Sequence, residues 1–361
     1  MKILHIASIT DDPCSGTDVA VPQHVLAQQA LAEVAFINVT NVAIPGVVTQ
    51  LPYSGKAGLD GLAGMWALPD VVVFHGVYVV EYLALYPWFV EHGVPYIIVP
   101  HGCFSRVAQR KKRLKKLVAN ALLFNRFFRG ATAVQYLSAG EQAASAYTLP
   151  GFIGTNGICM PSVYKTSFSE NGLRLVFIGR CEVAIKGLDL LLQAVAQERA
   201  LFAEKGVHLA LYGPDVENGH AQLRDWIREW DLEDCVTLHG PITGKEKEAA
   251  LLGADWYIQT SRTEGMPMSI IEALSYGVPC FVTEGTGLAD TIAQAGAGLG
   301  CATTAEGIGR GLRKLVASSG QLPVFSKGAR ELAKKGFERQ AVAAETVAAY
   351  AAYAQKSTKG L

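Results

Sequence analysis

The stretch RLVFIGRCEVAIKGLDLLLQA, residues 174–194, decides the fold class of this chain. It opens with an apolar run typical of a buried parallel strand, continues into a turn at Gly179 and Arg180, and predicts a helix from about Lys186. A strand, a glycine-containing turn and a helix in this order are how a doubly wound α/β domain begins. The stretch therefore predicts that a second α/β domain opens near the middle of the 361 residues.

Short apolar runs alternate with longer helical patterns on both sides of this stretch. Strands are expected at residues 3–7, 34–39, 71–75 and 96–99 before it, and at 207–212, 235–238, 255–259 and 279–282 after it. The expected fold is α/β, with two Rossmann-like doubly wound domains that face each other across a cleft. The predicted domains are residues 1–160 and 161–335, and residues 336–361 are expected to include a helix that packs back on the first domain.

Composition excludes several classes of protein. Half of the residues are hydrophobic, and 32 basic residues balance 32 acidic ones, which argues against disorder, a coiled coil and a dedicated nucleic-acid binder. No apolar run approaches the roughly 18 residues that a membrane span needs, and acidic residues follow too early for a signal peptide. Seven cysteines without a Cys-X-X-Cys pair indicate reduced thiols, so we expect a cytoplasmic protein.

The most informative motif is SRTEGMPMSIIEALSYGVP, residues 261–279, in which seven residues separate Glu264 from Glu272. The motif follows a strand and opens a helix, and Pro267 suits the first helical turn. Three amides are expected to point out of the helix N-terminus, where they could bind an anion: those of Gly265, Met266 and Met268. The two carboxylates lie up to roughly 12 Å apart along a helix. That spacing suits one extended ligand better than a hydrolytic pair, although two exposed acids would explain the motif equally well.

Two cations flank the turn that follows the first strand of the second domain. Side chains at that position of a doubly wound sheet reach the ligand crevice. A bidentate cation at Arg180 and a point charge at Lys186 together suit a pyrophosphate. The alternative interpretation is that both are solvated surface cations.

Together these motifs resemble those of the retaining nucleotide-sugar glycosyltransferases of the GT-B fold, group 1 type. The resemblance covers most of the chain and extends to residues 101–102, 156–158, 186–189, 212–215, 236–240 and 337–339. It implies transfer of a sugar from a nucleoside-diphosphate sugar to a carbohydrate or lipid-linked acceptor, in the synthesis of cell-surface polysaccharide or glycolipid. It also implies that no metal ion or other cofactor takes part, which agrees with the absence of an Asp-X-Asp triplet from the sequence.

The resemblance assigns roles to individual residues. Those implied to act in catalysis are His101, Glu264, Arg180 and Lys186. Those implied to bind the donor are Gly16, Arg180, Lys186, Gly265, Met266, Met268 and Glu272. Arg180 and Lys186 would neutralise the diphosphate, Glu272 would bind the ribose, and Gly16 would let the backbone approach the phosphate. His101 would lie over the donor sugar. His75, which also ends a strand, is the best alternative candidate for this role. The other six histidines are expected to be structural.

A basic segment occupies residues 106–129, with nine Arg or Lys residues and no acidic residue between Gly102 and Gly140. Its apolar residues fall at helical spacing on one face: Leu114, Leu117, Val118, Ala121 and Leu122. Two interpretations stay open. The segment either lies on the anionic inner face of the plasma membrane, or packs its apolar face on its own domain. Nucleic acid is not expected as a partner because no aromatic residues interleave with the cations.

Two further functional hypotheses stay open. One is a catalytically inactive subunit that binds a nucleotide sugar, and the other is a sugar-nucleotide epimerase of the same architecture. A dinucleotide dehydrogenase is disfavoured, because the glycine run at residues 296–300 comes late in the chain and lacks the preceding strand.

Overall fold

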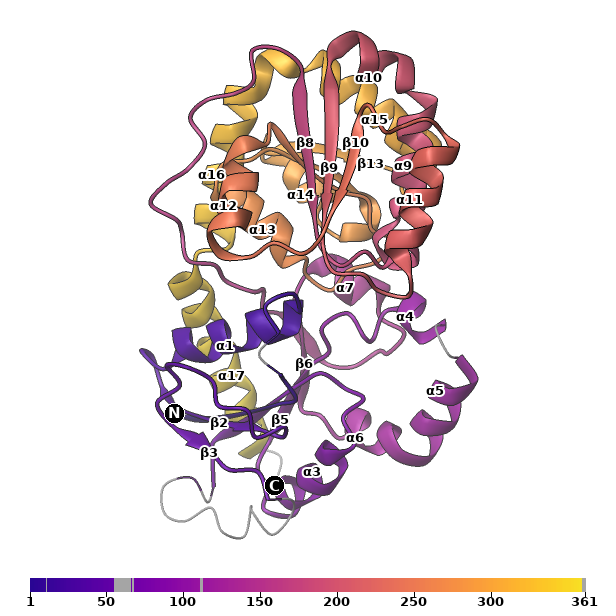
Figure 1. The fold of residues 1–361 in the computed structure, drawn as a ribbon. Coiled ribbons are helices and arrows are strands. Elements are labelled where there is room, and N and C mark those ends of the chain that lie inside the picture. Colours follow the sequence, from indigo (N-terminus) through magenta and orange to yellow (C-terminus); the bar gives the residue numbers. More distant parts are fainter. Residues whose placement is uncertain (11, 55–65, 67, 111–112, 359–361) are drawn as a thin grey trace. The chain divides into compact units, whose positions relative to one another are not determined.

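The computed structural model describes residues 1–10, 12–54, 66, 68–110 and 113–358. The chain divides into two compact units, unit 1 (Met1–Gly157 with Arg339–Leu361) and unit 2 (Ile158–Glu338). Each unit is built on a parallel β-sheet with helices packed around it (Figure 1). The α/β class predicted from the alternating pattern is confirmed.

The sheet of unit 1 has the strand order β3-β2-β1-β4-β5-β6-β7, and neighbouring strands run parallel. Its strands are β1 (Lys2–Ala7), β2 (Glu33–Asn38), β3 (Gln50–Leu51), β4 (Val71–His75), β5 (Tyr96–Val99), β6 (Ala133–Tyr136) and β7 (Gly151–Ile153). The order reverses between β1 and β4. Loops that leave the carboxyl ends of such a pair diverge to opposite faces and open a crevice, which is where doubly wound sheets bind ligands.

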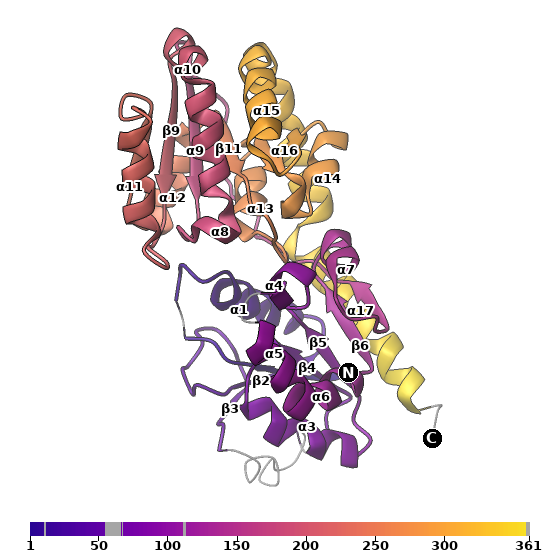
Figure 2. The ribbon, with the colours of Figure 1, turned by 90° about the vertical axis from the view of Figure 1, so that its right-hand side faces the viewer.

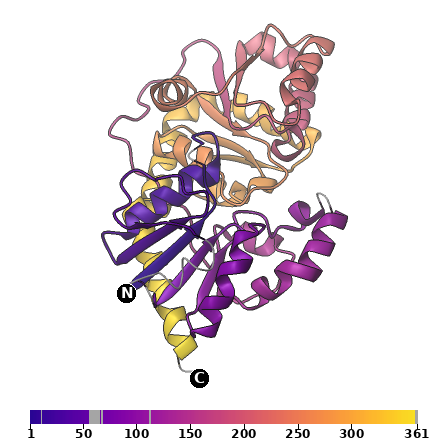
Figure 3. The same ribbon diagram turned by 60° about the horizontal axis from the view of Figure 1, so that its bottom comes forward.

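The helices of unit 1 include one from the far end of the chain. They are α1 (Gly16–Gln28), α3 (Glu81–Glu91), α4 (Arg106–Arg110), α5 (Arg113–Ala119), the π-helical η2 (Asn120–Phe124), α6 (Asn125–Arg129), α7 (Ala139–Ala144) and α17 (Arg339–Thr358). Helix α17, yellow in Figure 3, packs against α1, and its Tyr350 is fully buried. Residues 339–358 therefore complete the core of unit 1.

The basic segment differs from the single amphipathic helix that its spacing suggested. It forms α4, α5, η2 and α6, and Lys111 and Lys112 lie outside the described residues. Phe124, Phe127 and Phe128 are buried, and Phe127 stacks on Tyr96 of β5 with ring centroids 5.6 Å apart. Aromatic rings bury more apolar area than leucines, so they take the inward positions. Of the two interpretations left open, the one in which the leucine face packs on its own domain is therefore wrong.

The sheet of unit 2 has the order β10-β9-β8-β11-β12-β13, again with parallel neighbours. Its strands are β8 (Leu173–Ile178), β9 (Val207–Tyr212), β10 (Val236–His239), β11 (Trp256–Gln259), β12 (Cys280–Thr283) and β13 (Gly298–Cys301). The order reverses between β8 and β11, which is the switch point of this sheet. The glycine run at residues 296–300 leads into β13 and does not form a strand-to-helix turn.

The helices of unit 2 surround this sheet (Figure 2). They are α8 (Val183–Lys186), α9 (Leu188–Gln197), α10 (Arg199–Lys205), α11 (Gly219–Glu229), α12 (Gly244–Gly253), α13 (Met268–Ser275), α14 (Ala289–Gln294), α15 (Ala305–Ala317) and α16 (Leu322–Gly336), with 3-10 turns η3 (Glu284–Thr286) and η4 (Ser319–Gln321). The helix expected from about Lys186 begins earlier, at Val183, and breaks at Gly187. Within the described ranges, no helix has both the length and the apolar character needed to cross a membrane.

Candidate functional site

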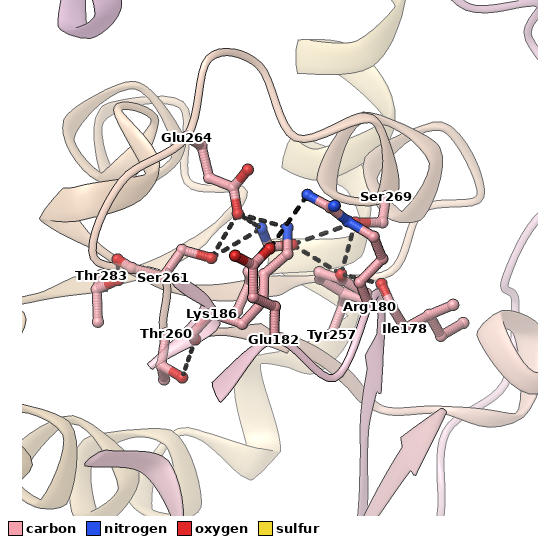
Figure 4. Close-up of polar contacts among 11 residues, drawn as sticks. Ile178, Arg180, Glu182, Lys186, Tyr257, Thr260, Ser261, Glu264, Ser269 and Thr283 are labelled. Atoms are coloured by element: carbon pink, nitrogen blue, oxygen red, sulfur yellow. Dashed lines mark hydrogen bonds and ion pairs between the residues drawn. The ribbon is translucent and has the colours of Figure 1, made fainter. Parts of the chain in front are cut away.

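Three of the residues singled out in unit 2 lie at the switch point of its sheet. Arg180 follows β8, Lys186 ends α8, and Glu264 lies in the loop after β11 (Figure 4). Strands β8 and β11 are neighbours in the sheet, so the segments that leave their carboxyl ends start side by side. This arrangement places the site where a doubly wound sheet holds its ligand.

An ion pair between Lys186 and Glu264 forms the centre of this site. Nζ of Lys186 lies 2.6 Å from Oε1 of Glu264, and the two side chains are 12% and 13% exposed. The same oxygen accepts hydrogen bonds from Oγ of Ser261 at 2.6 Å and from Nε2 of Gln259 at 2.8 Å. Three donors on one oxygen hold the carboxylate in place and leave Oε2 to other partners.

The backbone between α8 and α9 requires a glycine at position 187. Its φ is +64°, and a Cβ there would lie 2.1 Å from the carbonyl oxygen of Thr260. Oγ1 of Thr260 in turn donates to the carbonyl oxygens of Lys186 and Gly187, each at 3.2 Å. The break between α8 and α9 therefore lets the chain carrying Lys186 pass against the end of β11.

A second ion pair ties the loop after β11 to α9. The guanidinium of Arg262 contacts both carboxylate oxygens of Asp189, at 2.8 and 2.6 Å, and these hydrogen bonds raise its pKa. The amide of Arg262 donates to the carbonyl of Ile185 at 2.8 Å. Side chain and backbone thus hold residues 183–189 against the loop that carries Glu264.

Arg180 is more exposed to solvent than Lys186, the other cation predicted to bind the diphosphate. Its side chain is 49% exposed, and Nη2 lies 3.4 Å from Oε2 of Glu182, which is 9% exposed. A separation of that size at an exposed guanidinium is a weak contact. Arg180 can therefore turn toward an anion without breaking a strong bond.

A buried tyrosine joins the two strands to the helix that follows them. The hydroxyl of Tyr257, on β11, lies 3.0 Å from the carbonyl of Ile178 and 2.8 Å from Oγ of Ser269 in the first turn of α13. Burial raises the pKa of Tyr257, so its hydroxyl stays protonated and keeps a hydrogen to donate. The start of α13 is thereby held at the end of β8.

The N-terminus of α13 begins later than the motif suggested. The helix starts at Met268 with Pro267 as its N-cap, so the placement of Pro267 in the first turn is wrong by one residue. Gly265 and Met266 consequently lie in the loop before the helix, and Met268 is buried. Only the amide of Met268, among the three proposed, belongs to the helix.

Glu272 lies a turn into α13 and does not share the Glu264 cluster. Its Oε2 is paired with Nζ of Lys247 on α12, and the two side chains are 18% and 25% exposed. Glu264 and Glu272 are therefore each held by a separate lysine. This pairing does not support the alternative of two solvated acids.

His101 in unit 1 sits in a strained turn beyond β5. Its φ is +48°, and Gly102 follows with φ +82°. A left-handed conformation at a residue with a Cβ costs on the order of 1 kcal/mol. Glu141, 1% exposed on α7, holds the turn because its carboxylate accepts from the amides of Gly102 and Leu137.

His75, the alternative candidate for the role given to His101, is in contact with it. Nδ1 of His75 lies 3.3 Å from Nε2 of His101, and both line a small cavity with His24, Gln135 and Asn156. His5 and His24, which were expected to be structural, join this group through contacts between β1, β4 and α1.

Gly16 begins α1, with Ser15 as the N-cap whose side chain accepts from the amide of Asp18. A Cβ at Gly16 would meet no atom within 4 Å. The described structure therefore leaves open space where a phosphate was expected to approach the backbone.

Sequence reasoning missed several residues of the site. Gln259, Ser261, Tyr257 and Arg262 were not singled out, although polar residues at the end of an otherwise apolar strand, as in WYIQTS at 256–261, were an available signal. Glu141 was missed too, although Ser138 and Glu141 have the spacing of a helix capping box. Across the residues that the structure describes, no three His, Cys, Asp or Glu side chains gather in a way that could hold a metal ion.

Comparison with known proteins finds a family that resembles part of this chain. Residues 164–336, which fall within unit 2, match the family model for glycosyl transferases group 1. This part of the chain is therefore similar to the group 1 glycosyltransferases. The switch-point cluster of Lys186 and Glu264 lies inside the region that matches this family model.

Curated proteins that are similar to this chain include two mannosyltransferases. The GDP-mannose:cellobiosyl-diphosphopolyprenol alpha-mannosyltransferase of Xanthomonas campestris is 24% identical over 237 residues, which cover 64% of this chain and 61% of that protein. The MMP alpha-(1->4)-mannosyltransferase of Mycolicibacterium hassiacum is 28% identical over 179 residues, covering 49% of this chain and 42% of that protein. The chain therefore spans less than two thirds of the length of either relative.

Solved structures share the fold of this chain over nearly its whole length. HepE of Anabaena, in complex with UDP and glucose, has a TM-score of 0.73 and 15% identity, over 98% of this chain and 100% of its own. Sucrose-phosphate synthase of Thermosynechococcus elongatus has a TM-score of 0.74 and 16% identity, over 97% of this chain and 98% of its own. The α/β GT-B fold is thereby confirmed.

Proposed function

We propose that this protein transfers a sugar from a nucleoside-diphosphate sugar to a carbohydrate or lipid-linked acceptor, with retention of anomeric configuration. The observation that carries the proposal is the Lys186–Glu264 pair at the switch point, held by Gln259 and Ser261. The family of unit 2 and the names of the relatives support the reaction class. Cell-surface polysaccharide or glycolipid synthesis is the process that we infer for it.

The donor diphosphate would be neutralised by the two cations at the end of β8. Arg180 is open to solvent and offers a bidentate fork, and Lys186 supplies a point charge that is already desolvated. A charge at a site screened from water acts more strongly on the leaving group than an exposed one. Two cations can stabilise a departing diphosphate, so we propose that the transfer needs no metal ion.

The remaining predicted residues would bind the two ends of the donor. Glu272, on α13, would accept hydrogen bonds from the ribose, and Glu264 with the loop at Gly265 and Met266 would hold the sugar. Lys186 would then be shared between Glu264 and the phosphate. The loop is suited to this role because the contact of Arg262 with Asp189 holds its base in place.

The transfer itself can be written as one displacement. The acceptor hydroxyl oxygen forms a bond to the anomeric carbon on the face from which the diphosphate leaves, and the bond from that carbon to the diphosphate oxygen breaks. The hydroxyl proton passes to the leaving diphosphate. The products are the glycosylated acceptor and the nucleoside diphosphate, and attack on the leaving-group face retains the anomeric configuration.

An exposed apolar surface in unit 1 favours a lipid-linked acceptor. We define the leucine surface as the exposed apolar residues Val107, Leu114, Leu117, Val118, Leu122 and Leu123, whose exposure ranges from 44% to 78%. Exposed cations lie among them, including Arg110, Arg113 and Lys115. Leucines next to cations, with no acidic residue between positions 102 and 140, complement an anionic bilayer surface. We therefore propose peripheral attachment to the anionic inner face of the plasma membrane.

The experiment is a thermal-shift panel of UDP, GDP, ADP, CMP and their sugar conjugates, with and without EDTA, followed by product analysis with the stabilising donor. A ligand that binds only the folded protein raises its apparent stability. GDP-mannose comes first, because the names of two relatives specify mannosyl transfer. Stabilisation without release of sugar to any acceptor would favour the inactive binding subunit, and conversion of the donor sugar alone would favour an epimerase. Loss of stabilisation with EDTA would reject metal independence.

A further inference from the structure

A chain of hydrogen bonds between histidines runs from His101 into the core of unit 1. Nε2 of His101 lies 3.3 Å from Nδ1 of His75, and Nε2 of His75 lies 2.9 Å from Nδ1 of His5. Nε2 of His5 lies 3.0 Å from Oε1 of Gln28. These residues come from the turn after β5, from β4, from β1 and from α1, so the chain crosses the switch point of the sheet.

Burial keeps these rings neutral. It lowers the pKa of His5 to about 3 and the pKa of His101 to about 4, and repulsion from His24 adds to both shifts. Burial likewise holds the pKa of His75 well below its usual value. A neutral imidazole carries one N–H and one lone pair, so a ring that accepts at one nitrogen must donate from the other.

The contacts at the end of the network farthest from His101 determine which group donates each hydrogen bond. The carbonyl oxygen of Gly154 accepts from Nε2 of Gln135 at 2.7 Å, which turns Oε1 of Gln135 toward Tyr350. The hydroxyl of Tyr350 donates to that Oε1 at 2.5 Å, so its oxygen accepts from the amide of Gln28. The same Gln28 nitrogen lies 2.6 Å from Nε2 of His24. A backbone carbonyl thus determines which way the side-chain amide of Gln28 faces.

The orientation of the Gln28 amide then determines which nitrogen of each histidine carries the proton, as far as His101. Oε1 of Gln28 can only accept, so His5 donates to it from Nε2 and accepts at Nδ1. His75 must therefore donate to His5 from Nε2 and accept at Nδ1. It follows that His101 donates from Nε2 and carries a lone pair on Nδ1.

We propose that His75, His5 and Gln28 are positioning residues that hold His101 with its proton on Nε2 and an acceptor lone pair on Nδ1. No atom of the described residues forms a hydrogen bond with Nδ1 of His101, so that lone pair is available. The inference rests on the proposed function, in which His101 lies over the donor sugar. An acceptor nitrogen there binds a sugar hydroxyl, which is a hydrogen-bond donor.

The tautomer is measured first, by two-bond 1H–15N NMR of the imidazole rings in the full chain without ligand. The expected spectrum shows His101 protonated on Nε2 only. Two other histidines serve as internal references: Nδ1 of His92 donates to the carbonyl of Trp88 at 2.7 Å, and Nε2 of His220 donates to the carbonyl of Gly213 at 3.0 Å. A proton on Nδ1 of His101 would overturn the proposal.

Variants then separate positioning from simple structural support. His75→Phe removes both hydrogen bonds, so His101 should populate both tautomers and kcat should fall about tenfold with KM for the donor nearly unchanged. His75→Gln keeps a carbonyl for His101 and an N–H for His5, and should restore the tautomer and most of kcat. His92→Phe, outside the network, is the matched control and should leave kcat unchanged.

Two outcomes decide against the proposal. If His75→Phe lowers kcat while His101 keeps a single Nε2 proton, or if His75→Gln is as impaired as His75→Phe, the role is structural. If His75→Phe does not fold, Gln28→Met tests the same prediction three hydrogen bonds away from His101. The NMR measurement needs no donor. The expected tautomer in a protein that transfers no sugar would therefore support the positioning and reject the proposed function.

Discussion

Nζ of Lys186 lies 2.6 Å from Oε1 of Glu264, and this contact joins segments 78 residues apart in the sequence. The pair is largely removed from water, since the side chains are 12% and 13% exposed. Each charge therefore depends on the other when no ligand is present. A donor diphosphate would enter a site whose lysine is already desolvated and oriented, which lowers the cost of arranging it.

Replacing Lys186 tests the diphosphate site. We expect Lys186→Ala to weaken donor binding by at least about tenfold, because a charge-assisted bond to phosphate is lost. It should also destabilise the protein by about 1–3 kcal/mol, since Glu264 is left without its partner. The double variant Lys186→Ala/Glu264→Ala should recover stability but not donor binding. Thermal shift with and without nucleoside diphosphate measures both effects, and unchanged donor binding in Lys186→Ala would refute the assignment.

Gly16→Ala distinguishes an effect on stability from an effect on donor binding. A Cβ at this position meets no atom within 4 Å, and alanine favours a helix more than glycine does. Stability should therefore stay the same or rise by up to about 1 kcal/mol. Donor affinity should fall, because the methyl group would occupy the space of the phosphate. Full donor affinity in Gly16→Ala, measured by titration, would remove Gly16 from the site.

Gly187→Ala should destabilise unit 2. The substitution places a Cβ 2.1 Å from the carbonyl of Thr260 at a φ of +64°, so the backbone between α8 and α9 must shift. We expect a loss of about 2–4 kcal/mol in urea unfolding. Gly253→Ala is the matched control, since a Cβ there meets nothing within 4 Å. Equal stability of the two variants would contradict the steric argument.

The buried histidines predict that unit 1 weakens in acid. The groups that face one another are His5, His24, His75 and His101, together with the hydroxyl of Tyr350. Burial lowers the folded pKa of His5 to about 3 and of His24 to about 4, so below pH 6.5 the unfolded chain binds more protons than the folded one. Stability is fully present above pH 6.5 and is lost as the pH falls toward these values.

Hydrogen exchange of the full chain measures this loss. Each such histidine should reduce stability by about 1.4 kcal/mol per pH unit within the window. Peptides from β1 and β4 should lose protection between pH 7 and pH 5 faster than peptides from β11 and β12, after correction for intrinsic exchange. His24→Gln should make the dependence shallower. Equal loss in both sets of peptides would rule out the histidine network as the cause.

The leucine surface predicts binding to anionic lipid. Wild-type protein should sediment with vesicles of phosphatidylcholine and phosphatidylglycerol but not with phosphatidylcholine alone, and added salt should weaken the binding. Leu122→Glu should reduce binding to the vesicles about tenfold. It removes apolar area that the lipid would bury, and its carboxylate is repelled by the anionic headgroups. Val324→Glu, at a 69% exposed position on α16, is the control and should bind as wild type does. Equal binding to both kinds of vesicle would contradict the electrostatic part of the proposal.

The sequence by itself determined the α/β class and most of the central strands. The predictions at 71–75, 96–99 and 207–212 match β4, β5 and β9, because strands covered on both faces read as continuous apolar runs. Strands β3, β6, β7 and β13 were missed, and of these β7 and β13 each begin at a glycine that breaks such a run. Arg180, Lys186, Glu264 and Glu272 were selected as candidates from their sequence motifs and from the family resemblance.

Only the tertiary structure decided how those residues are paired. The contacts of Lys186 with Glu264 and of His5 with His75 join residues 78 and 70 positions apart. A local pattern carries no information on such contacts, because they depend on which strands become neighbours when the sheet assembles. The exposed leucines at 114–123 show the same limit. Helical spacing marks an apolar face, and the packing of the phenylalanines against β5 decides that the face is left in water.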